Sequence, residues 1–139
     1  MAKSSLPDLE TFAKEKIGAD NYPDDVHIYA EANCEKCGIV PFEVILEHWN
    51  GDSPVDFYGV IRLRCSVCGK EKEYLSITEE GGKLVYREQY RCKCDNHTFY
   101  VASCDRIEVW EGKPCFFDEG VVVGKCSRCG LLLTIAMTD

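Results

Sequence analysis

Cysteine is the residue type through which this sequence can do chemistry, and its spacing is regular. Six of the ten cysteines form three Cys-x2-Cys pairs, each followed by glycine: Cys34-x2-Cys37-Gly38, Cys65-x2-Cys68-Gly69 and Cys126-x2-Cys129-Gly130. A two-residue spacer makes a tight turn that points both thiolates at one ion, and the small residue after it lets backbone N–H groups approach the sulfurs. Repeated pairs of this kind are typical of zinc sites.

The cellular compartment decides between metal binding and disulfides, because disulfides persist mainly in exported proteins. The first seven residues, from Met1 to Pro7, contain no apolar core of signal-peptide length. No apolar run approaches the ~20 residues needed to cross a bilayer. We therefore expect a cytoplasmic protein with no membrane segment, whose closely spaced cysteines bind metal.

A fourth cysteine pair is irregular, since Cys92 and Cys94 are separated by a single residue. Cys94-x2-His97 also has the spacing of a metal-binding turn, and imidazole and thiolate are both ordinary zinc ligands. We favour Cys92 and keep His97 as the alternative ligand. Asp95 and Asn96 would then supply the left-handed backbone that Gly38 supplies in the first pair.

The second half of the chain resembles the first. Residues 47–69 and 108–130 align without gaps and are identical at nine of 23 positions, including both cysteines of each pair. Extending the alignment toward the N-terminus places Cys34 and Cys37 opposite Cys92 and Cys94, although the second copy has extra residues before its tryptophan. We infer an internal duplication in which each copy carries its own four cysteines.

The apolar pattern predicts β-strands in both copies. Alternating or β-branched residues mark strands at 41–48, 58–65, 83–91, 98–110, 121–123 and 131–137. Glu79-Glu80-Gly81-Gly82 is the expected hinge between the copies. With 45% hydrophobic and 11% aromatic residues in a chain of 139, the composition supplies a core and excludes low-complexity and disordered classes.

A short helix is expected only near the N-terminus. Ser5 can cap it, Pro7 lies in its first turn and Gly18 ends it. Leu9, Phe12, Ala13 and Lys16 share one face. This helix either covers one of the small sheets, which we favour, or forms an arm that binds a partner.

The paired cysteines and the strands between them resemble the zinc-ribbon family, whose rubredoxin-like fold holds one ion between two cysteine turns. The resemblance implies two tetrahedral sites, one formed by Cys34, Cys37, Cys65 and Cys68 and the other by Cys92, Cys94, Cys126 and Cys129. It implies a mainly β fold of two tandem ribbons, small antiparallel sheets with a short N-terminal helix. The divisions would be 1–28 (helix and extended arm), 29–80 (first ribbon) and 81–139 (second ribbon).

Two structural zinc ions are the expected cofactors, with iron as the alternative. Each ribbon has about 50 residues, a size at which burial alone is marginal, whereas a structural zinc contributes ~10–16 kcal/mol of coupled folding free energy. Four protein ligands leave no coordination position for water, which a catalytic zinc requires. We find no catalytic residues in the sequence and expect a protein that is not an enzyme.

Charge points to a protein as the binding partner. The formal net charge is −8, and two zinc sites with four thiolates each would take it to about −12. Binding to a phosphate backbone depends on clustered cations, and only small basic stretches exist, around Arg62, Arg64 and Lys70. We expect a protein-interaction module that does not bind nucleic acid when isolated and has an unidentified protein partner.

Two alternative functions follow from the same fold. Residues 65–74 resemble the second cysteine turn of rubredoxins, which carry electrons on iron, although the proline usual there is replaced by Ser66. The other alternative is an accessory zinc ribbon in a nucleic-acid machine. Cys104 and Cys115 have no counterparts in the first copy. They are either two packed free thiols, which we favour, or a redox pair.

Overall fold

Strands dominate the structure, which confirms the prediction of a mainly β protein. The computed structural model describes residues 6–50, 57–78 and 80–138, and of residues 20 and 114–118 it describes the backbone alone. The helical elements are α1 (Pro7–Lys16) and the 3-10 helix η1 (Ala19–Asn21). The strands are β1 (Val26–Glu31), β2 (Phe42–Asn50), β3 (Gly59–Cys65), β4 (Glu71–Ile77), β5 (Lys83–Gln89), β6 (Thr98–Trp110), β7 (Lys113–Cys126) and β8 (Leu132–Thr138).

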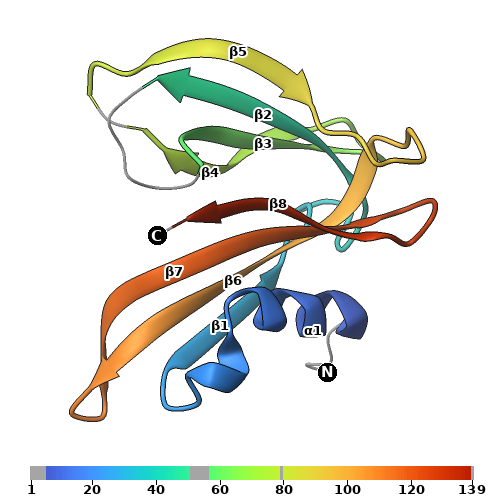
Figure 1. The fold of residues 1–139 in the computed structure, drawn as a ribbon. Coiled ribbons are helices and arrows are strands. Elements are labelled where there is room, and N and C mark those ends of the chain that lie inside the picture. Colours follow the sequence, from blue (N-terminus) through green and yellow to red (C-terminus); the bar gives the residue numbers. More distant parts are fainter. Residues whose placement is uncertain (1–5, 51–56, 79, 139) are drawn as a thin grey trace.

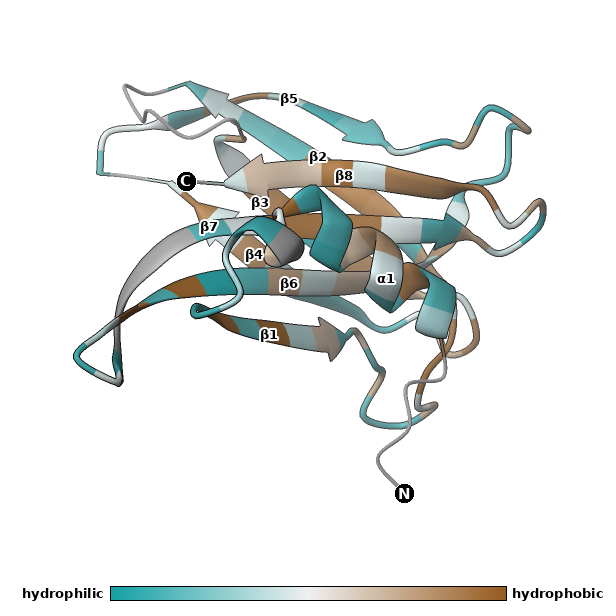
Figure 2. Ribbon diagram, turned by 60° about the horizontal axis from the view of Figure 1, so that its bottom comes forward, coloured by the Kyte–Doolittle hydropathy of each residue, from teal (hydrophilic) through white to brown (hydrophobic). Residues whose placement is uncertain are grey.

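Helix α1 forms near the predicted place and covers a sheet. Pro7 lies at its start, Asp8 and Glu10 occupy the first turn, and Gly18 follows its end with a φ of 67°. The predicted cap Ser5 lies outside the described residues. Leu9, Ala13 and Ile17 are fully buried against β6 and β7, and Figure 2 shows the helix lying across these strands. The covering role is therefore confirmed.

All strand pairs are antiparallel and join into one eight-stranded sheet. The order is β4-β3-β2-β6-β7-β8, with β1 added to β6 and β5 added to β2. Figure 1 shows two layers, one containing β2 to β5 and the other containing β1, β6, β7 and β8, with α1 on the outside of the second layer. The layers are joined where Phe42 of β2 pairs with Phe99 of β6. The rubredoxin-like topology of each half stays a prediction.

The first strand of each half pairs with the other half. β1 precedes the first cysteine turn but pairs with β6, from Val26↔Ile107 to Glu31↔Ala102. β5 precedes the third cysteine turn but pairs with β2, as in Ile45↔Gln89. The division at residues 28/29 and 80/81 stays a prediction. The hydrogen bonds of β1 and β5 each connect one predicted ribbon to the other.

The main core lies between the two layers. Phe42, Val44 and Leu46 of β2 point into it, as the alternation predicts, together with Phe99 and Val101 of β6. Ile45 and Glu47, on the opposite face of β2, are also buried. Their face carries no helix in the described part of the chain. Arg62, Arg64 and Arg87 form ion pairs with Glu47 and Glu43 on β2, and long charged side chains of this kind can shield apolar surface while their charged ends stay in water.

Six strands lie at predicted positions, and β1 and β4 are additional. β4 begins Glu71-Lys72-Glu73, three exposed charged residues that give no strand pattern on their own. Within the described ranges, no helix has the length and apolar character required to span a membrane.

Candidate metal centres

The first candidate centre forms where two turns meet. Cys34 and Cys37 lie in the turn between β1 and β2, and Cys65 and Cys68 lie in the turn between β3 and β4. The turns approach each other because β2 and β3 pair with Phe42 opposite Cys65. The four sulfur atoms all lie within 4.8 Å of one another.

Backbone N–H groups point at the sulfur of Cys65, as the turn chemistry predicts. The N–H groups of Val67 and Cys68 donate to its Sγ at 3.4 and 3.5 Å. The N–H of Cys68 is the largest influence that lowers the pKa of the Cys65 thiol, to about 6, against the opposing effect of burial. Burial and the neighbouring sulfurs raise the pKa of Cys37 to about 12. Repulsion between neighbouring thiolates opposes the ionisation of all four thiols together. A divalent cation between the sulfurs would offset that repulsion.

The second candidate centre repeats this arrangement with Cys92, Cys94, Cys126 and Cys129, whose sulfurs also lie within 4.8 Å of one another. The N–H groups of Arg128 and Cys129 donate to Cys126 Sγ at 3.4 Å each. A third donor, the side-chain amide of Asn96, reaches the same sulfur at 3.4 Å. Burial raises the pKa of the Cys126 thiol, but these donors outweigh it and lower the pKa to about 6.

In the irregular turn, the structure brings Cys92 into a group of four cysteines that could hold an ion. Cys92, rather than His97, belongs to the four-sulfur group. Asp95 takes the left-handed backbone with a φ of 71°, where the first turn uses Gly38 with a φ of 81°. The N–H of Cys92 donates to the carbonyl of Asn96 at 2.9 Å. Asn96 does not adopt a left-handed conformation, and its side chain supports the sulfur instead, a role that the sequence did not reveal.

The sulfur spacing fits a tetrahedral metal ion. A Zn–S bond of about 2.3 Å implies sulfur–sulfur edges of about 3.8 Å in a tetrahedron. The distances are 3.7 Å between Cys34 and Cys68, 3.5 Å between Cys92 and Cys129 and 3.6 Å between Cys94 and Cys126. These cysteines are thiols and not disulfides. The two groups can therefore each hold a metal ion, and an all-sulfur donor set suits zinc or iron.

The two centres lie close together because the sheet connects them. Cys65 pairs with Phe42, Phe42 with Phe99, and Phe99 with Cys126. Three steps between neighbouring strands, at about 4.8 Å each, separate the two cysteine backbones by roughly 14 Å. Phe42 and Phe99 are almost completely buried between the centres.

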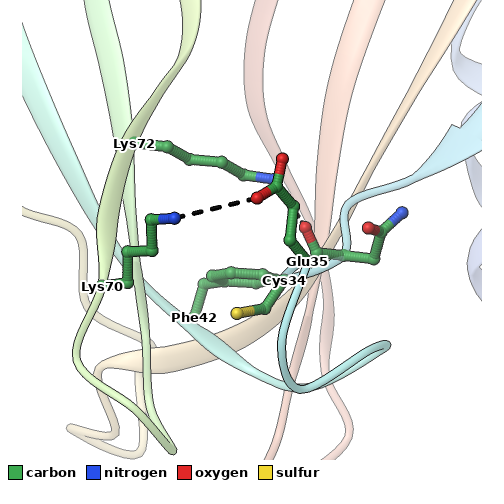
Figure 3. A pocket seen from close by; sticks show the side chains of 6 residues that line it. Cys34, Glu35, Phe42, Lys70 and Lys72 are labelled. Carbon is green, nitrogen blue, oxygen red and sulfur yellow. Dashed lines mark hydrogen bonds and ion pairs between the residues drawn. The ribbon is translucent and has the colours of Figure 1, made fainter.

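A cavity beside the first centre contains two lysines. It has a volume of about 390 Å³ and is lined by Asn33, Cys34, Glu35, Phe42, Lys70 and Lys72, as Figure 3 shows. The Lys70 ammonium lies 3.8 Å from the Glu35 carboxylate. The Lys72 ammonium donates to the carbonyl oxygen of Asn33. If the four cysteines hold an ion as thiolates, these cations would partly balance the negative charge of the centre.

The arginines beside β2 form ion pairs within the protein. Glu47 accepts ion pairs from Arg62 and Arg87, each at 3.2 Å. Glu43 pairs with Arg64 at 3.1 Å. The pKa of Arg62 is raised by its hydrogen bond to Glu47. Sequence reasoning missed these pairs because β3 and β5 supply the cations to β2 from opposite sides.

The remaining sequence candidates are separated from the centres. Cys104 is completely buried beneath α1, and burial raises the pKa of its thiol to about 11. Cys115 lies in β7, and its side chain is outside the described atoms. Trp110 is 63% exposed at the end of the β6–β7 hairpin, whereas Trp49 is half-buried.

Comparisons of the chain with protein-family models, curated proteins and solved structures find no significant match. The site itself is therefore the basis for inferring the function.

Proposed function

We propose that this is a non-catalytic zinc-binding protein whose two metal ions stabilise the fold, and that the folded chain acts as a protein-interaction module. The observation that carries the proposal is the pair of four-sulfur groups with tetrahedral spacing. All four donors in each group come from the protein, so the coordination shell is closed, as in structural zinc sites. The repeated strand pairing of the two halves supports the inferred duplication.

The β6–β7 hairpin is the surface that supports an interaction role. It extends beyond the rest of the sheet in Figure 1, and Trp110 is exposed at its end. Exposed tryptophan is a frequent anchor of protein interfaces. The net charge of −8 and the internal pairing of Arg62 and Arg64 favour a protein partner with a basic surface over nucleic acid. Free thiols in this number fit a cytoplasmic location.

Metal analysis with a visible absorption spectrum tests the metal part of the proposal, on protein purified natively and after recombinant expression. We expect two zinc ions per chain and no colour. Red native protein that contains iron and bleaches on reduction would replace the proposal with a rubredoxin-like electron carrier. Iron in the recombinant sample alone would reflect the metal that the host supplies.

A cross-linking pull-down with the wild-type chain and with Trp110→Ala tests the interaction part. We expect partners with basic surfaces that are captured by the wild type and lost with the variant, while both proteins keep two metal ions. A salt-sensitive gel shift of DNA or RNA by the pure protein would contradict the proposal. It would favour an accessory role in a nucleic-acid machine.

A further inference from the structure

Equivalent rows of residues cross the strands of the two layers. In the first layer, the strand pairings align one row from β5 through β2 and β3 to β4: Tyr86, His48, Gly59 and Ile77. In the second layer, the corresponding row runs from β1 through β6 and β7 to β8: Ile28, Asp105, Gly120 and Thr138. His48 and Asp105 therefore occupy the same position in the two halves, each opposite a glycine.

The space above the first row is occupied by an aromatic side chain of the protein, Phe57. The ring of Phe57 lies 5.8 Å from the ring of His48 in an edge-to-face arrangement. The backbone N–H of Phe57 donates to the carbonyl of Met137 in the opposite layer at 3.2 Å. Phe57 belongs to the buried core between the layers. The space over this row thus accepts a ring.

The second row lines an open cavity of about 310 Å³. Tyr74, Leu75 and Ile77 of β4 form one wall. The other walls come from the second layer, where the row is joined by its neighbours: Ser103, Asp105, Gly120, Val121, Val122 and Thr138. A volume of this size with apolar walls and a few polar groups is typical of sites for small molecules.

Asp105 gives this cavity a negative charge. The carboxyl group is half-buried, and burial raises its pKa above the ordinary value. Among the residues that the structure describes, no lysine, arginine or histidine forms an ion pair with it. In the equivalent position His48 is paired with Glu88 at 2.8 Å. Ile28, next to Asp105 in the row, is 48% exposed and extends the apolar surface toward solvent.

We propose that this cavity is a binding site for a small organic cation, a molecule with an apolar ring and a protonated amine. The ring would lie between Leu75 and Val122, in the way that Phe57 fills the equivalent space. The ammonium would pair with the Asp105 carboxylate, near the hydroxyl groups of Ser103 and Tyr74. A cation is favoured because an unpaired carboxylate in apolar surroundings gains most from an opposite charge.

A nuclear magnetic resonance titration of the metal-loaded full chain with 2-phenylethylamine tests the site. We expect shifts in the amide signals of residues 74–77, 103–105, 120–122 and 138. 2-Phenylethanol, the neutral analogue, should bind at least ten-fold more weakly, and phenylacetate should not bind. Asp105→Asn should weaken amine binding at least ten-fold and leave binding of the alcohol unchanged.

Two further variants keep the test decisive. Ser103→Leu places in the cavity the residue type found at the equivalent Leu46 and should abolish binding of the amine and the alcohol. Glu108→Gln removes a carboxylate elsewhere on β6 and should leave the affinity for the amine and for the alcohol unchanged. Equal binding of amine and alcohol, shifts confined to other acidic surfaces, or no shift at 10 mM amine would each overturn the proposal. Metal content is measured on the same samples, so a failure of the metal proposal is seen separately.

Discussion

Cys65 and Cys126 occupy equivalent places at the residue scale, each as the first cysteine of its turn and each with backbone N–H groups aimed at its sulfur. Such donors stabilise a thiolate and therefore a thiolate–metal bond. Both sulfurs belong to buried residues, whereas Cys68 and Cys129 lie exposed on the outer side of the turns. Each centre would thus receive one ligand from a buried cysteine of the turn and another from an exposed cysteine of the same turn.

Replacement of Cys65 by serine should empty the first centre and destabilise the whole chain, because the exchanged strands β1 and β5 connect the two halves. A structural zinc supplies ~10–16 kcal/mol of coupled folding free energy, more than a domain of this size holds in reserve. Metal analysis should show a loss of at least one of two ions, and circular dichroism should show lost strand signal. Cys104→Ala is the matched control, because Cys104 is buried away from both centres. A Cys65→Ser protein with two ions would contradict the ligand assignment.

Cys104 should resist alkylation while the protein is folded. Its pKa, raised to about 11 by burial, leaves roughly one thiol in ten thousand ionised at pH 7, and the thiolate is the reactive form. Raising the pH to 9 increases that fraction about a hundred-fold, but the side chain stays inaccessible. Peptide-level mass spectrometry after iodoacetamide treatment should show modification of Cys104 only in denaturant. Rapid alkylation at pH 7 would mean that α1 does not cover the thiol.

Helix α1 is the clearest packing unit at the element scale. It places Leu9, Ala13 and Ile17 on Ala102, Cys104, Val121 and Val123 in a cluster separate from the main core. The opposite layer has no helix on its outer face in the described ranges, and ion pairs of Glu43 and Glu47 occupy that face. The outer faces of the two layers are therefore covered by different means.

Leu9→Ala should lower the free energy of unfolding by about 2–5 kcal/mol, because the leucine is completely buried and leaves a cavity. Denaturant titration measures the change, and both metal ions should remain bound in the native protein. Glu15→Ala, on the exposed side of the same helix, should change stability by less than about 0.5 kcal/mol. Equal effects of the two variants would show that the helix does not pack on the sheet in solution.

Sequence reasoning located the elements better than their partners. Three of the four cysteine turns could be predicted because each is specified by a short Cys-x2-Cys-Gly spacing. Strand β6 could be predicted from the apolar pattern of its own residues. β5 was predicted as a strand, yet nothing in Lys83–Gln89 shows that it pairs with β2 rather than with its own half. The cavity at Asp105 was also missed, because β4 and β6 belong to opposite layers and face each other only in the folded protein. Long-range pairing depends on the whole chain, and local patterns do not contain it.

At the scale of the whole molecule, the exchanged strands make the two halves depend on each other. A fragment of residues 1–80 lacks β5, and a fragment of residues 81–139 lacks β1. Each fragment would also expose one side of the Phe42–Phe99 junction. We therefore expect the chain to unfold as one cooperative unit, although it contains two centres.

Neither fragment should bind its metal as tightly as the full chain does. We expect each fragment alone to lose its ion at a chelator concentration at least ten-fold lower. Mixing the two fragments with zinc should restore the strand signal and the chelator resistance. Competition with a chromophoric chelator measures the affinity, and the control is the full chain cleaved after synthesis between Glu80 and Gly81. Full affinity in the separate fragments would establish two independent ribbons.

The pairing of β1 with β6 also sets the order of events during synthesis. The paired residues are roughly 70–80 positions apart in the chain, so at about 5–20 residues per second the ribosome needs roughly 4–15 s to make the partner strand. During that interval Val26–Glu31 lacks its partner strand, and both cysteine turns of the first centre are completed before that strand is made. Zinc captured early would hold the nascent first half in place before its sheet is complete.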